Sequence, residues 1–197
     1  MKVVILGKGN MGAPLCVLAR KAGHQVECFD SRTSPVAALQ EADIVVIAMK
    51  YEQALALAEN QAILSALAGK IVVDITNPLS PDFMSLTVGH TSSAAEEIAG
   101  RMPGIHVVKA FNTIFAALLQ RRADGHSVDI PVYVAGDQEA SVQTVADFVK
   151  SMGLNVVLSG QLSNARYLEP MAELMIQLGY GLDHGDQIGF ALKNEAA

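Results

Sequence analysis

The feature that most constrains the fold is the segment GKGNMG, which places Gly7, Gly9 and Gly12 directly after the apolar run Val3–Leu6. The spacing G-x-G-x-x-G between a strand and a helix is typical of a loop that binds a dinucleotide. Its first glycine permits a tight turn, its second lets a pyrophosphate approach the backbone, and its third lets the helix pack on the strand. The N–H groups that open the helix then face the phosphates. The sequence therefore predicts a dinucleotide site at this loop.

Short runs rich in Val and Ile alternate with helical stretches along the chain. The runs expected to be strands are Val3–Leu6, Val26–Phe29, Ile44–Ala48, Ile71–Ile75, Val107–Ala110, Val132–Val134 and Val156–Leu158. The helices are expected over Met11–Ala22, Gln53–Ala68, Ala94–Arg101, Glu139–Ser151 and Leu168–Gly179. Continuous apolar strands suit a parallel sheet that is covered on both faces. The pattern predicts an α/β, Rossmann-type, doubly wound and mostly parallel sheet in three layers.

The organisation of the chain indicates one unit rather than several. Its 197 residues contain no internal repeat and no linker rich in Pro, Gly or Ser. We therefore expect a single NAD(P)-binding domain over residues 1–197, with a C-terminal helical extension over residues 162–197. The stretch Arg121–Ile130 is the most polar part of the chain and is expected to form an exposed loop.

Composition argues against several classes of partner. Hydrophobic residues make up 51% of the chain, enough for a sizeable core. The net charge of −6 and the absence of a Lys and Arg cluster argue against nucleic-acid binding. No apolar run reaches the length of about 18 residues that a membrane-spanning helix needs. Cys16 and Cys28 lie in apolar runs without a metal-like spacing, so we expect two buried, reduced thiols and a cytoplasmic location.

Polar residues follow several of the expected strands, at the edge where open α/β sheets bind their ligands. The residues expected to line the cofactor are Lys8, Asn10 and Met11 in the glycine loop, Ala48, Met49 and Lys50 at the third strand, Thr76, Asn77 and Pro78 after the fourth, and Ala110 and Asn112 at the fifth. Structural roles are the alternative: Asn and Pro favour turns, Asn10 could cap the first helix, and Lys50 could be a solvated surface lysine. Their shared location is the reason to group them.

The segment CFDSRT bears on which nicotinamide cofactor is bound. It places Asp30, Ser31 and Arg32 after the second expected strand. An acid at this position accepts the two ribose hydroxyls of NAD, whereas an arginine accommodates the 2′-phosphate of NADP. On a strand, neighbouring side chains point to opposite faces, so either the acid or the Ser-Arg pair would face the ribose; a loop would relax this. From these residues alone, NADP and NAD both stay open.

No triad, metal-ligand spacing or acid–base pair stands out in the chain, so no catalytic residue is assigned. This favours hydride transfer, in which the cofactor carries the chemistry and the protein supplies position, orientation and exclusion of water. A dehydrogenase that acts on a hydroxyl group would need a general acid or base beside the substrate oxygen. Transfer of hydride to a flavin-like ring depends less on a general acid or base from the protein.

Three further blocks, DITNPL at 74–79, SSAAEEIA at 92–99 and VVKAFNTI at 107–114, accompany GKGNMG and DSR. With them the chain resembles the deazaflavin (coenzyme F-420)-dependent NADP oxidoreductases, and it is similar to the cytosolic oxidoreductase domain of the six-transmembrane ferric reductases. The resemblance implies that Ser31 and Arg32 hold the 2′-phosphate of NADP. It also implies that the segments Thr76–Pro78 and Ala110–Asn112 border the nicotinamide. Asp30 departs from the glycine that is frequent in these relatives, as Lys50 departs from a common proline.

Together these features predict an NADP-dependent oxidoreductase that transfers hydride between NADPH and a flavin or deazaflavin acceptor. NAD stays an alternative because of Asp30. Two other functions compete: a reductase of a small carbonyl or imine, with a pocket completed by a second subunit, and a non-catalytic module that senses a dinucleotide. Leu168, Met171, Met175 and Leu178 recur at helical spacing, as either the face of a homodimer or part of the core.

Overall fold

The structure, a computed structural model, describes residues 1–195 and is built on one seven-stranded sheet. The strands are β1 (Lys2–Leu6), β2 (Gln25–Phe29), β3 (Ile44–Ile47), β4 (Ile71–Asp74), β5 (His106–Lys109), β6 (Val132–Gly136) and β7 (Val156–Leu158). They lie in the order β2-β1-β3-β4-β5-β6-β7. β6 runs antiparallel to β5, and the other neighbouring pairs are parallel. The predicted α/β fold with a mostly parallel sheet is confirmed.

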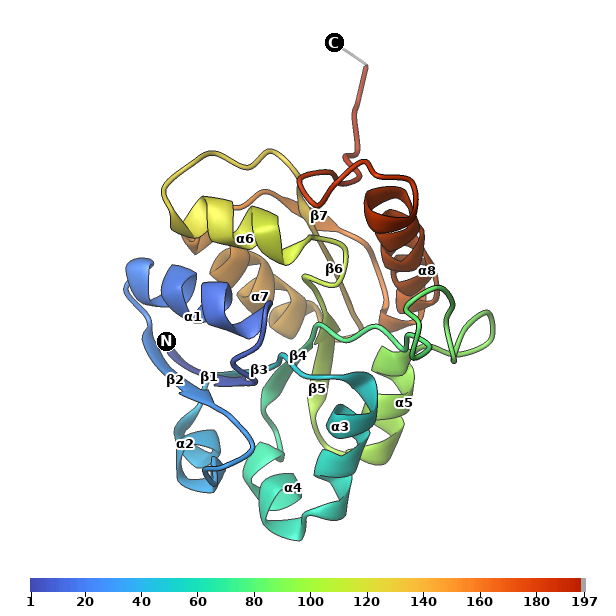
Figure 1. The fold of residues 1–197 in the computed structure, drawn as a ribbon. Coiled ribbons are helices and arrows are strands. Elements are labelled where there is room, and N and C mark those ends of the chain that lie inside the picture. The colour runs from blue at the N-terminus through green and yellow to red at the C-terminus, as the bar shows by residue number, and fades with distance from the viewer. Residues whose placement is uncertain (196–197) are drawn as a thin grey trace.

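Helices cover both faces of the sheet and complete three layers (Figure 1). They are α1 (Gly12–Lys21), α2 (Val36–Glu41), α3 (Tyr51–Ala56), α4 (Gln61–Leu67), α5 (Ala94–Arg101), α6 (Ala116–Ala123), α7 (Glu139–Ser151) and α8 (Ala165–Ile176). One apolar cluster joins the sheet to α1, α6 and α7, and a second joins it to α2, α4 and α5. The neighbours Val45 and Val46 of β3 belong to different clusters, because successive side chains of a strand point to opposite faces.

The helix expected over Gln53–Ala68 is divided in the structure into α3 and α4. Asn60 separates them and begins α4, because its side-chain Oδ1 accepts the backbone N–H groups of Ala62 and Ile63 over 3.0 and 3.3 Å. Asparagine is a favoured residue at this position because it satisfies donors that have no partner within the helix.

Two helices were missed in the sequence, α2 and α6. The expected loop over Arg121–Ile130 was therefore partly wrong, since α6 extends to Ala123. Leu118 and Leu119 of α6 are buried while Gln120 and Arg121 are exposed. The polar stretch thus begins on the outer face of a short amphipathic helix.

Helix α8 packs beside α5, on the right in Figure 1, and continues into a wider π-helical turn at Gln177–Gly181. Residues 182–195 contain no helix or strand. Within the predicted apolar stripe, Leu168 and Met175 are buried in this chain, whereas Met171 and Leu178 are half-buried. The stripe therefore contributes to the core of the chain.

The two cysteines are joined, contrary to the expectation of two separate thiols. A disulfide links Cys16 in α1 to Cys28 in β2, with the two Cα atoms 6.6 Å apart. This separation lies within the usual range for disulfides. The sequence did not reveal the pair, because only the packing of α1 against β2 brings the two residues together. Among the described residues, no helix is long and apolar enough to cross a membrane.

Candidate dinucleotide-binding site

The candidate site lies where the strand order changes direction. From β1 the chain passes to β2 on one side and then to β3 on the other, so the loops after β1 and β3 leave the same edge of the sheet together. Backbone hydrogen bonds join these strand ends. The N–H of Ala48 donates to the carbonyl of Leu6, and the N–H of Gly7 donates to the carbonyl of Phe29, both over 2.8 Å. Ligands of open α/β sheets bind at such a point.

The glycines of the loop meet three different surroundings. A Cβ added to Gly7 would lie 1.9 Å from the carbonyl oxygen of Ala48, and Gly7 has a φ of +118°. A Cβ on Gly12 would lie 2.0 Å from the carbonyl oxygen of Gly7. Nothing lies within 4 Å of a Cβ on Gly9. Gly7 and Gly12 therefore let the backbone turn and pack, while Gly9 leaves open space before the N-terminus of α1, as a pyrophosphate requires.

The other residues predicted around this loop lie at its surface. Lys8, Asn10 and Lys50 are exposed, and Met11 and Met49 are half-buried. Asn10 does not cap α1, because Met11 is the residue that precedes the helix and no side chain caps it. The alternative structural role of Asn10 is therefore not found, and its side chain faces solvent beside the loop.

The acid and the arginine after β2 are paired with each other. β2 ends at Phe29, so Asp30 and Arg32 lie in a loop and strand alternation does not apply to them. One carboxylate oxygen of Asp30 accepts the backbone N–H of Arg32 over 3.0 Å, and the other accepts its guanidinium over 2.7 Å. Hydrogen bonds from Arg32 lower the pKa of Asp30 to about 2, so its carboxyl is ionised at neutral pH.

Two cations flank this single acid. The Nζ of Lys8 lies 3.8 Å from the Asp30 carboxylate, and the Arg32 side chain is 85% exposed. The three side chains together carry a net positive charge beside the glycine loop. The arginine and the acid are therefore partners in one cluster rather than exclusive alternatives, as the loop geometry permits.

The loops after β4 and β5 meet through two asparagines. The Nδ2 of Asn112 donates to Oδ1 of Asn77 over 3.0 Å and to the carbonyl of Leu168 in α8 over 2.9 Å. The Nδ2 of Asn77 donates in turn to the carbonyl of Asn112 over 3.3 Å. The predicted grouping of Thr76–Pro78 with Ala110–Asn112 is thus present in space, and α8 adjoins it.

Features typical of ligand sites gather at this meeting point. Phe111 is fully buried and has a φ of +61°, which is rare for a residue with a bulky side chain. Such backbone strain is concentrated at ligand and catalytic sites. Three buried oxygens of the loops after β4 and β5 have no hydrogen-bond partner within the part of the chain that the structure describes: Thr76 Oγ1, Asn112 Oδ1 and Thr113 Oγ1.

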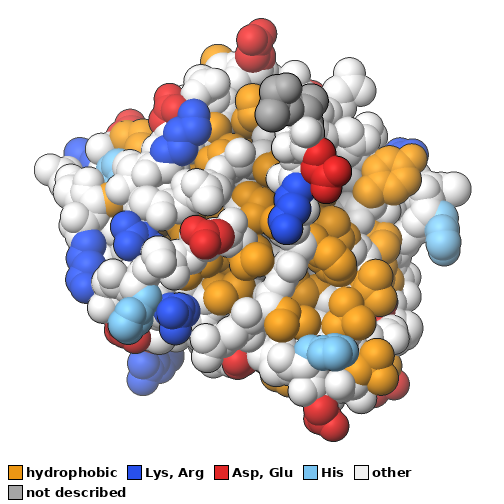
Figure 2. Space-filling view, turned by 90° about the horizontal axis from the view of Figure 1, so that it is seen from above, with side chains coloured by type: hydrophobic (Ala, Val, Ile, Leu, Met, Phe, Trp, Pro, Cys, Tyr) orange, Lys and Arg blue, Asp and Glu red, His pale blue; other side chains and the backbone are white. Residues whose placement is uncertain are grey.

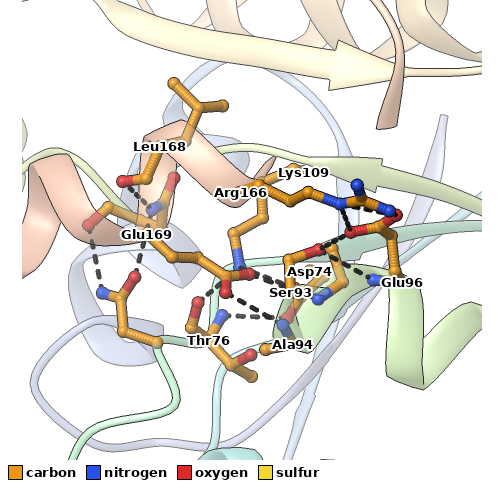
Figure 3. Close-up of polar contacts among 12 residues, drawn as sticks. Asp74, Thr76, Ser93, Ala94, Glu96, Lys109, Arg166, Leu168 and Glu169 are labelled. Carbon is orange, nitrogen blue, oxygen red and sulfur yellow. Dashed lines mark hydrogen bonds and ion pairs between the residues drawn. The ribbon is translucent and has the colours of Figure 1, made fainter. Parts of the chain in front are cut away.

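A buried cluster of charges underlies these loops (Figure 3), and the sequence did not reveal it. Lys109 is fully buried, and its Nζ donates to Asp74 Oδ2 over 2.8 Å, to Glu169 Oε1 over 2.7 Å and to the Thr76 carbonyl over 2.5 Å. An ammonium has three N–H donors, and all three are used here. Burial acts to lower the pKa of Lys109, but the carboxylates of Asp74 and Glu169 outweigh it and the pKa is raised. Lys109 is therefore charged.

The same cluster joins three sequence blocks that had been grouped only by resemblance. Asp74 comes from DITNPL, Lys109 from VVKAFNTI, and the backbone N–H groups of Ala94 and Ala95 from SSAAEEIA. These two N–H groups donate to the Glu169 carboxylate over 2.9 and 3.2 Å. A charged residue that ends an otherwise apolar strand, as in IVVD and HVVK, was the signal that could have indicated the cluster.

An apolar surface lies on the side of the molecule that carries α8 (Figure 2). Figure 2 shows hydrophobic side chains gathered on the side where α8 lies. The exposed residues here are Phe83 and Met84 of the loop after β4, Tyr180 of the π-helical turn and Leu182 directly after it. Gln177 joins the two segments, since its Nε2 donates to the carbonyl of Met84 over 3.3 Å. We call these four exposed residues the apolar rim.

The fold and the glycine loop define a dinucleotide-binding domain, and comparison with known proteins gives its class. Residues 2–80 match the NAD-binding domain of 6-phosphogluconate dehydrogenase. The chain is 38% identical over 103 residues to the metalloreductase STEAP3 of Rattus norvegicus, a match that covers 52% of this chain and 20% of the rat protein. The matching part thus spans about a fifth of the length of that relative.

Solved structures extend the likeness to nearly the whole chain. A protein from Arthrobacter sp. FB24, described as a candidate coenzyme F-420-dependent NADP-reductase, is 27% identical with a TM-score of 0.87, covering 98% of this chain and 100% of that one. An imine reductase from Myxococcus stipitatus in complex with NADP⁺ shares the fold at 16% identity and a TM-score of 0.69, covering 93% of this chain and 63% of that one. The predicted resemblance is confirmed. Residues 2–80 thus match an NAD-binding domain, and the chain as a whole is similar to oxidoreductases of this fold.

Proposed function

We propose that this chain binds NADPH at the carboxyl edge of its sheet and transfers hydride between NADPH and a planar flavin or deazaflavin acceptor. The observation that carries the proposal is the open backbone at Gly9, held between two glycines that tolerate no side chain, at the N-terminus of α1. The bound nicotinamide would supply the hydride chemistry, and the protein would supply position and exclusion of water. The residues proposed to line the cofactor are Gly7, Lys8, Gly9, Asn10, Met11, Gly12, Ser31, Arg32, Ala48, Met49, Lys50, Thr76, Asn77, Pro78, Ala110 and Asn112.

The preference for NADP is proposed from the charges after β2. A 2′-phosphate would meet the exposed guanidinium of Arg32 and the ammonium of Lys8, which together outweigh Asp30. Charge-assisted contacts of this kind are about twice as strong as neutral hydrogen bonds. The ribose hydroxyls of NADH would have to share the Asp30 carboxylate with the backbone N–H and the guanidinium of Arg32.

Replacing Arg32 with alanine is expected to weaken NADPH binding by about 10- to 100-fold, because a charge-assisted contact contributes about 1.5–3 kcal/mol. NADH binding is expected to hold or improve, because Asp30 loses its partner. Fluorescence titration with both nucleotides measures the two dissociation constants. Arg121→Ala, on the exposed face of α6, controls for the loss of one positive charge. Equal losses for NADPH and NADH would show that Arg32 does not recognise the 2′-phosphate.

The ring acceptor is proposed from the apolar rim, which includes Tyr180, whose ring packs against Phe115 after β5, and residues of the same loop as Asn77. The apolar rim offers exposed aromatic and aliphatic side chains on which a planar ring can pack. Transfer to such a ring needs no general acid from the protein at the substrate oxygen, which agrees with the absence of an acid–base pair in the sequence.

Stopped-flow mixing of the NADPH-loaded protein with FMN or with a 5-deazaflavin is expected to oxidise the bound NADPH in one turnover. The fall in absorbance at the nicotinamide band measures the rate. Turnover of a cyclic imine or a ketone, without oxidation by either ring, would replace the proposal with the small-molecule reductase. If NADPH binds tightly but no tested acceptor oxidises it, the result would favour the sensing module. The single-domain organisation with a C-terminal extension, the homodimer and the cytoplasmic location stay predictions.

A further inference from the structure

Glu169 of α8 connects three elements that are far apart in the sequence. Its Oε1 accepts Lys109 Nζ of β5 and the N–H of Ala95, and its Oε2 accepts the N–H of Ala94. The two N–H groups open α5, so a carboxylate from another helix caps that helix from outside. Each polar contact of Glu169 is to a donor, which fits an ionised carboxylate, although its burial raises its pKa.

Lys109 also contacts the loop after β4. The carbonyl of Thr76 accepts Lys109 Nζ, and the N–H of Thr76 donates to Asp74 Oδ1 over 2.9 Å. The peptide groups on both sides of Thr76 are therefore held by charged, buried partners (Figure 3). Asn77 follows immediately and pairs with Asn112. A chain of contacts thus runs from Glu169 through Lys109 and Thr76 to the asparagine pair, and Asn112 also donates directly to the Leu168 carbonyl of α8.

We infer that Glu169 is a positioning residue for the reaction: through Lys109 it fixes the Thr76–Asn77 loop against the cofactor, so that α8 belongs to the reacting unit and is not an accessory helix. The inference rests on the proposed function for its kinetic part. A reaction that needs close approach and alignment is sensitive to small displacements, and a shift of about 1 Å can cost about 100-fold in rate.

A second ion pair between α5 and α8 provides a matched control. Arg166 of α8 forms a two-pronged contact with Glu96 of α5, at 2.6 and 2.9 Å. This pair ties the same two helices together but has no hydrogen bond to the Thr76–Asn77 loop. Glu96→Gln and Glu169→Gln each remove one carboxylate from the same helix interface, and only the second acts on Lys109.

The test measures NADPH affinity by fluorescence titration and single-turnover oxidation by FMN. Glu169→Gln is expected to lower the rate by about 10- to 100-fold while the dissociation constant for NADPH changes less than about twofold, because the glycine loop follows β1, which is separated by β3 from β4 and the Thr76–Asn77 loop. Glu96→Gln is expected to change neither. Equal effects of the two variants, or parallel losses of rate and affinity in Glu169→Gln, would overturn the inference.

Hydrogen exchange of the full chain supplies a readout that does not depend on activity. Glu169→Gln is expected to speed exchange in a peptide covering residues 74–80, without speeding it in β1 or β3. Should that variant not fold, Glu169→Asp keeps the charge and withdraws it by one methylene group. Unfolding of both, or unchanged exchange in residues 74–80, would reduce Glu169 to a purely structural residue. A wild-type protein that oxidises no NADPH would end the proposed function, and the exchange result would still decide the positioning.

Discussion

Replacing Lys109 with methionine is expected to lower the free energy of unfolding by about 3–5 kcal/mol, the usual cost of removing one partner from a buried ion pair. The two carboxylates of Asp74 and Glu169 are both buried and would be left facing each other without a cation. Methionine has nearly the length of lysine, so the loss of charge, rather than a cavity, would dominate. Urea unfolding followed by circular dichroism measures the change.

Lys150→Met is the control for this prediction. Lys150 pairs with Asp147 at 3.6 Å on the surface of α7, where both side chains are more than half exposed. Exposed pairs contribute about 0–1 kcal/mol, so the control is expected to change stability within that range. A loss below about 1 kcal/mol for Lys109→Met would show that the buried cluster carries no uncompensated charge after the substitution, contrary to its geometry.

Gly7→Ala is expected to destabilise the protein by about 2–5 kcal/mol and to abolish measurable NADPH binding. Its Cβ would lie 1.9 Å from the Ala48 carbonyl oxygen, so the end of β1 and the loop after β3 must separate. The φ of +118° adds a backbone penalty of about 1–3 kcal/mol. Thermal denaturation and fluorescence titration of the same sample measure the two effects.

Gly9→Ala separates binding from folding in the same loop. An added Cβ meets nothing within 4 Å, so stability is expected to stay within about 0.5 kcal/mol of the wild type. NADPH affinity is nevertheless expected to fall, because the methyl group occupies the open space in which a pyrophosphate would approach the backbone. Unchanged affinity in a folded Gly9→Ala protein would place the phosphates elsewhere.

The sequence predicted the parts of the site that depend on local order. A strand, a glycine spacing and a helix are neighbours in the chain, so the loop at Gly7, Gly9 and Gly12 could be predicted without knowledge of the tertiary contacts. The same holds for the sheet, whose Val- and Ile-rich strands are recognisable one by one. The division of a helix at Asn60 was missed, although the capping residue is itself a local signal.

The parts that were missed depend on contacts between distant residues. Lys109 and Glu169 are 60 positions apart in the chain, and the sequence around either residue does not indicate that they pair. The Cys16–Cys28 disulfide depends on how α1 packs against β2. Asp30 and Arg32 were treated as exclusive on a strand, although residues two apart share one face of a strand, and the structure pairs them in the loop after Phe29.

The distance between Lys109 and Glu169 has a consequence for how the chain is made. Synthesis proceeds from the N-terminus, so β5 leaves the ribosome well before α8. Until α8 arrives, the N-terminus of α5 and the ammonium of Lys109 lack one of their anionic partners. Long-range contacts of this kind form late and slow folding. A nascent chain that stops before residue 169 would therefore hold the loop after β4 next to an incomplete core, exposed to chaperones and proteases until α8 docks.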